Sequence, residues 1–156
     1  MLRNIVVAAD GSDHAKQAVK LASEISVATG ARLTILHVLK GENSANIPDD
    51  LKEFARVEHV EANDTDWLQG VADKILDDAK DMAKAAGAKD VETRTEVGDP
   101  ATQIIGYCRA NSADLVIVGR RGLGDLQSLV LGSVSHKTSQ RAPCACMTVP
   151  GAKPDS

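Results

Sequence analysis

Five short apolar runs, separated by longer amphipathic stretches, constrain the fold of this 156-residue chain more than any other feature. The runs are rich in Val, Ile, Leu and Ala and are bounded by turn residues, which is typical of buried strands. The predicted strands are 4–9, 32–38, 91–97, 115–118 and 144–149. Strands that alternate with helices form parallel sheets through right-handed crossovers, so this order predicts an α/β fold.

Between these runs, apolar residues recur at spacings of three and four, which predicts helices. The predicted helices are 13–28, 66–86, 100–111 and 132–141. Gly30 and Gly87 follow the first two helices as C-terminal caps would, and Asp99-Pro100 provides the third with an N-cap and a first residue. The helices should cover both faces of an open five-stranded parallel sheet.

The remaining segments fit one domain. Residues 40–66 are polar and are expected to form a loop that carries a short helix at 49–60. The alternating segment 91–97 is typical of a strand near a sheet edge or of a strand with one face in solvent. We therefore expect a single domain at 1–150, followed by a flexible tail at 151–156.

Charge and composition restrict the class of partner. The chain has 18 Lys and Arg against 22 Asp and Glu, a formal net charge of −4, with one Phe, one Tyr and one Trp. A nucleic-acid-binding protein normally shows a basic face and stacking aromatics, so we expect no nucleic-acid partner. No apolar run reaches the ~18 residues of a membrane span, and the N-terminus does not resemble a signal peptide. These features predict a cytoplasmic protein that binds a small ligand or another protein.

The three cysteines, Cys108, Cys144 and Cys146, cannot all form pairs with one another. In a reducing compartment thiols are favoured over disulfides. A zinc site at Cys144 and Cys146 lacks a second pair of ligands at the usual spacing. We expect small buried core residues.

A glycine-rich segment, 119–135, follows the fourth predicted strand and holds four of the twelve glycines. Backbone N–H groups in such a segment can bind phosphate. A P-loop requires Lys before its final Ser or Thr, and position 131 is Leu; the G-x-G-x-x-G pattern fails because Gln127 replaces the third Gly. The segment therefore indicates either a nucleotide site or a flexible turn.

Further polar groups should lie beside this segment, because ligands bind at the carboxyl ends of parallel strands. Asp10 follows the first strand. There its carboxylate can accept hydrogen bonds from ribose hydroxyls, bind a metal ion or cap the next helix. The N–H groups of 132–135 and the hydroxyls of Ser133 and Ser135 suit phosphate oxygens. Arg120 and Arg121 either neutralise phosphate charge or lie on the surface.

Together these motifs resemble the universal stress protein family. The resemblance rests on four landmarks in the family's order: 5–12 (IVVAADGS), 36–38 (LHV), 98–100 (GDP), and Gly-x2-Gly-x9-Gly-Ser from Gly119 to Ser133. It extends over residues 3–149 and implies a Rossmann-like α/β fold that holds ATP, with or without Mg²⁺, at the carboxyl edge of the sheet. The family is usually homodimeric through its last strand, but Cys144 to Val149 departs from the family's usual proline and aliphatics.

The resemblance also implies roles for individual residues. Those expected near adenine and ribose are Ala8, Ala9, Asp10 and the backbone of Val38. Those expected along the ribose and phosphate path are Gly119, Arg120, Gly122, Gly132, Ser133, Val134 and Ser135. His136 follows them and is expected to face solvent.

The predicted function is therefore a nucleotide-dependent stress-response regulator, which binds ATP and changes state or partner affinity. The natural moving element is the segment 119–131. Two alternatives remain open: a slow ATP hydrolase and a protein-interaction adaptor with little nucleotide turnover. No catalytic residue is assigned, although Asp10, His136 and the two arginines are the candidates near a γ-phosphate.

Overall fold

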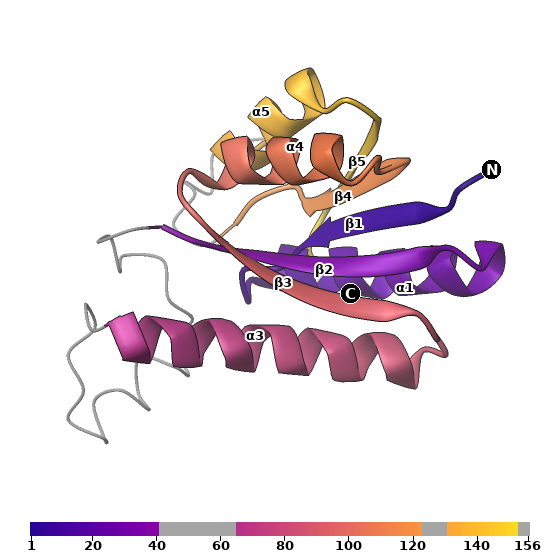
Figure 1. Ribbon diagram of the computed structural model, residues 1–156, viewed down its shortest axis with the longest axis horizontal. Helices are drawn as coiled ribbons and strands as arrows, with labels where there is room; N and C mark the ends of the chain where they lie inside the picture. Colours follow the sequence, from indigo (N-terminus) through magenta and orange to yellow (C-terminus); the bar gives the residue numbers. More distant parts are fainter. Residues whose placement is uncertain (41–64, 123–130, 153–156) are drawn as a thin grey trace.

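The computed structural model describes residues 1–40, 65–122 and 131–152 (Figure 1). Its strands are β1 Asn4–Ala8, β2 Arg32–Leu39, β3 Val91–Val97, β4 Leu115–Gly119 and β5 Ala145–Val149. Its helices are α1 Asp13–Thr29, α3 Thr65–Ala85, α4 Pro100–Ala110 and α5 Ser133–Arg141. Each predicted element in these ranges is confirmed, and its boundaries agree to within one residue. The helix predicted at 49–60 lies outside the described residues.

All five strands are parallel, in the order β3-β2-β1-β4-β5, which confirms the predicted open sheet. β1 occupies the centre of the sheet. Its buried residues Ile5, Val6 and Val7 are all apolar, so none of these side chains requires a hydrogen-bond partner there. β3 forms one edge, which is one of the two placements that its alternating sequence indicated, and β5 forms the other.

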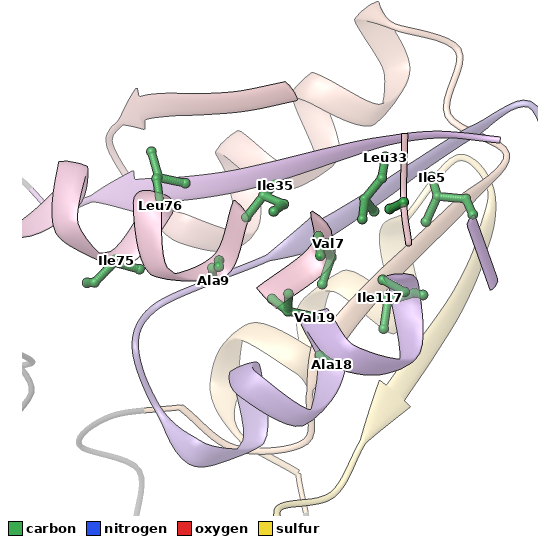
Figure 2. Close-up of a cluster of buried hydrophobic side chains, with 14 of the residues drawn as sticks. Ile5, Val7, Ala9, Ala18, Val19, Leu33, Ile35, Ile75, Leu76 and Ile117 are labelled. Carbon is green, nitrogen blue, oxygen red and sulfur yellow. The ribbon is translucent and has the colours of Figure 1, made fainter. Parts of the chain in front are cut away.

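Helices cover both faces of the sheet, with α1 and α3 on one side and α4 and α5 on the other (Figure 1). The larger core lies under α1 and α3, where Val19 and Ile75 pack against Val7 and Ile35 (Figure 2). Val, Ile, Leu and Ala fill these layers with few aromatics, because β-branched side chains pack well on parallel strands. Within the described ranges, no helix is both long and apolar enough to traverse a lipid bilayer.

The helix ends follow the expected capping chemistry. Gly30 adopts a left-handed φ of 73° and donates its N–H to the Ser26 carbonyl, which ends α1. The Asp99 carboxylate accepts the Thr102 N–H at 3.0 Å, and Pro100 occupies the first position of α4. These local signals fix where the chain leaves each strand.

The connections diverge at β1 and β4. β1 leads to α1 on one face, whereas β4 leads towards α5 on the other face. Neighbouring strands whose connections leave in opposite directions open a crevice at their carboxyl ends, where open α/β sheets bind ligands.

Candidate functional site

A cleft lies at this divergence, along the carboxyl ends of β1, β2 and β4. Its volume is about 1050 Å³, open solvent at the mouth included. Nine of the eleven predicted site residues line it: Ala8, Ala9, Asp10, Val38, Gly119, Gly122, Ser133, Val134 and Ser135. The tertiary structure therefore brings three separate sequence segments to one cavity, while their individual roles stay predictions.

Arg120 and Gly132 are absent from the described lining of the cleft. The Arg120 N–H donates to the Val149 carbonyl at 2.6 Å, and its own carbonyl accepts the Gly132 N–H at 2.7 Å. These bonds tie the end of β4 to β5 and to the start of α5. Arg121 lines the cleft instead, so Arg121 is the arginine placed to meet a ligand charge.

Gly119 has a structural reason to be glycine besides its place in the cleft. A Cβ built on Gly119 would lie 2.8 Å from the backbone carbon and the Cβ of His14, and 2.9 Å from the Ala15 nitrogen. The last residue of β4 thus packs directly on the first turn of α1. This packing requires a glycine at position 119 whether or not a ligand is bound.

The first turn of α5 presents backbone donors to the cleft. Gly132 is the N-cap, and the first intrahelical bond is donated by the His136 N–H, so N–H groups of 133–135 have no acceptor within the helix. Ser133 is exposed at this end. Such a helix N-terminus favours an anion through its free donors and its dipole.

The Ser135 hydroxyl points into the protein backbone. Ser135 is 1% exposed, and its Oγ–H has two acceptors, the Arg120 carbonyl at 2.6 Å and the Gly132 carbonyl at 3.0 Å. The hydroxyl therefore braces the turn, and the part of Ser135 available to an anion is its N–H group. His136 is exposed, as expected, and is absent from the described lining.

Asp10 does not cap α1. Ser12 does, because its Oγ accepts the Ala15 N–H at 3.2 Å. The Asp10 carboxylate accepts the Ser12 N–H at 2.9 Å and so orders the turn between β1 and α1. Asp10 is also the acidic side chain among the described residues that line the cleft.

Several residues in the wall of the cleft were not predicted from the sequence. His37 lines the cleft, is 9% exposed and donates Nδ1–H to the Ala9 carbonyl at 2.7 Å, which leaves Nε2 as an acceptor. Burial lowers the pKa of His37, despite the opposing hydrogen bond to Ala9. The presence of the polar His37 inside an apolar strand could have identified it as a site residue. The apolar wall from α3, formed by Leu68, Val71 and Ile75, carried no such signal.

The beginning of the predicted moving segment is held in place. The Arg121 N–H donates to His14 Nδ1 at 3.3 Å, beside the contact of Gly119 with α1. Residues 123–130 lie outside the described part. The tail expected to be flexible also begins with a contact, because the Ala152 N–H donates to Asp13 Oδ2 at 2.8 Å.

The parallel five-stranded sheet defines a Rossmann-like α/β protein, with a cleft at the point where the strand order reverses. The universal stress protein family matches residues 1–150. The chain therefore belongs to the universal stress protein family.

Individual relatives agree over nearly the whole chain. Universal stress protein YxiE of Bacillus subtilis (strain 168) is 33% identical over 96% of this chain and 99% of its own length. A crystal structure of a universal stress protein in complex with cAMP is 30% identical, with a TM-score of 0.71 over 97% of this chain and 98% of that one. A family protein of Arabidopsis thaliana with AMP bound shares the fold at 20% identity, with a TM-score of 0.64 over 96% and 92%.

Proposed function

We propose that this protein binds an adenine nucleotide in the cleft, with ATP as the ligand, and that occupancy regulates a stress response. The observation that carries the proposal is the convergence of Asp10, the strand end at Val38 and the N–H groups of α5 on one cavity. These supply a ribose acceptor, an apolar slot beside β2 and an anion site. The relative solved with cAMP supports the class of ligand.

The apolar part of the cavity suits a base better than a second phosphate. Val38 at the end of β2 packs with Ile104 of α4 in the smaller core, and the lining also includes the α3 side chains of Leu68, Val71 and Ile75 from the larger core. A flat heteroaromatic ring gains by leaving water in such a slot, while strand backbone groups fix its edge.

We further propose that the protein holds ATP and does not turn it over rapidly. Fast phosphoryl transfer uses a lysine or arginine on the γ-phosphate and a positioned base. The glycine-rich segment lacks the lysine of a P-loop, since position 131 is Leu. Asp10, the carboxylate among the described lining residues, already accepts the Ser12 N–H. No group of three His, Cys, Asp or Glu suited to a metal ion occurs in the described ranges. Mg²⁺ would therefore arrive on the phosphates, with Asp10 as its protein ligand.

The test measures the melting temperature of the protein with and without Mg-ATP, and repeats it with AMP and cAMP. Ligand at about 100 times its Kd adds roughly 2.7 kcal/mol to the folded state, so a clear upward shift is expected. The decisive variant is Ser133→Asp. A carboxylate at an exposed helix N-terminus interacts favourably with the helix dipole but repels phosphate. The increase in melting temperature caused by nucleotide should therefore vanish, while the protein without nucleotide stays stable.

Ser139→Asp is the matched control, because it adds the same charge to an exposed position of α5 that does not line the described cleft. It should keep the full ATP shift. If wild type shows no shift with any of the three nucleotides, the adaptor alternative replaces this proposal. Release of phosphate by wild type that Asp10→Ala abolishes would instead establish the hydrolase.

We also propose that the protein is a cytoplasmic homodimer that pairs through β5. Binding of nucleotide would change its affinity for a protein partner. β5 is an edge strand, and its outward Met147 is 37% exposed. An edge strand offers unpaired backbone groups to a second copy. Gel filtration across a dilution series should show a dimer, and Met147→Lys should favour the monomer.

A further inference from the structure

The three cysteines, distant in sequence, form one cluster under α4. Cys108 lies on α4 and is 1% exposed, whereas Cys144 and Cys146 are half-buried at the beginning of β5. Residues two apart on a strand share a face, and both of these pack with Cys108 in the smaller core. All three are free thiols in the structure.

Within this cluster Cys144 and Cys108 are matched as a pair. The Cys108 and Cys144 thiols interact with each other, and both belong to the smaller core. Cys144 is reachable from solvent and Cys108 is not. One solvent-accessible thiol beside one buried thiol is the arrangement of an attacking cysteine with its resolving partner.

We propose that Cys144 and Cys108 are an oxidant-responsive pair, in which peroxide oxidises Cys144 and Cys108 resolves it to an intramolecular disulfide. The Cys144 thiolate attacks one peroxide oxygen, the O–O bond breaks, and the departing hydroxide takes up the thiol proton to form water. Cys108, as thiolate, then attacks the sulfenic sulfur of Cys144. The S–O bond breaks, and the leaving hydroxide takes up the Cys108 proton as a second water. Two thiols and one peroxide thus give one disulfide and two waters.

The same surroundings set the speed of this reaction. Burial raises the pKa of Cys108 to about 12, and burial also raises the pKa of Cys144. Both sulfurs are therefore protonated at neutral pH, so oxidation is slow and accelerates as pH rises. The disulfide would close a loop containing β4, the cleft segment and α5, which joins oxidation to the part of the chain that carries the cleft.

The test treats reduced, folded protein with hydrogen peroxide, blocks the remaining thiols with an alkylating agent and measures intact mass. Free thiols should fall from three to one, with loss of two hydrogen atoms, and the protein should stay one covalent chain. Peptide mapping without reductant should then join the Cys108 peptide to the one that contains Cys144.

Cys146→Ser is the matched control and should still lose both remaining thiols. Cys144→Ser should keep both of its thiols under the same treatment. Since Cys108 is buried and its replacement risks unfolding, Cys108→Ser is judged by a second readout: dimedone should label Cys144 in protein whose circular dichroism is native. Three thiols surviving in wild type, a link formed through Cys146, or disulfides only between chains would each overturn the proposal.

Discussion

Replacing Gly119 by Ala tests whether the first glycine of the motif is required by packing. An ideal Cβ there would sit 2.8 Å from the backbone carbon of His14, and ordinary Cβ contacts begin at 3.4 Å. The end of β4 and the first turn of α1 would have to separate by about 0.6 Å, from 2.8 to 3.4 Å. Both sides of this contact include backbone, which cannot rotate away. Gly119 does not have a positive φ, so the cost is steric and not conformational.

Overpacking of this kind costs about 1–3 kcal/mol. For a chain of this size each kcal/mol lowers the melting temperature by roughly 2–4 °C. Urea unfolding of the protein without nucleotide measures the difference directly. The controls are Gly70→Ala and Gly106→Ala, both within helices and with no atom within 4 Å of the new Cβ. Each should gain up to ~1 kcal/mol in stability. If Gly119→Ala unfolds at the same urea concentration as wild type, the packing argument is refuted.

Three further predictions concern stability and pH. Ser12→Ala removes the side-chain cap of α1 and should cost about 1 kcal/mol in urea unfolding; an unchanged midpoint would contradict the capping role. His37 has a pKa below its usual 6.5 because it is buried, so unfolding takes up a proton and stability should fall as pH drops below 6.5. His37→Asn should flatten that part of a stability-pH profile measured by urea titration, and an unaltered slope would exclude His37 as its source. The N–H groups of Arg3 and Asn4 lower the pKa of Asp114 below 3.8, so this stabilisation is present above that pH and is lost as pH falls through the lower folded value. Asp114→Asn should weaken the acid dependence seen by circular dichroism, and a profile identical to wild type would count against the assignment.

Most of the candidate site could be predicted because its residues sit where strands end. Asp10, Val38 and Gly119 each follow or close an apolar run, and parallel strands bring their carboxyl ends to one edge. The choice between Arg120 and Arg121 could not be made this way. It depends on the backbone bonds of Arg120 to β5 and α5, which arise only when those elements pack together.

The same distinction applies to the hydroxyl groups. Ser133 and Ser135 are equivalent in a sequence motif, yet one is exposed at the helix end and the other is buried against carbonyl groups. Helix periodicity turns residues two positions apart to different sides, and the neighbouring backbone decides which side is filled.

The sequence by itself determined the strands, the helices, the caps at Gly30 and Asp99 and the parallel direction of the strands, because apolar periodicity and capping residues act over a few positions along the chain. It also located the edge of the sheet that bears the cleft. Only the tertiary structure decided that Gly119 packs on α1, that His37 and the α3 side chains complete the wall, and that Cys108 meets Cys144. These contacts join residues far apart in sequence, and their geometry is set by how helices dock on the twisted sheet, which no local pattern encodes.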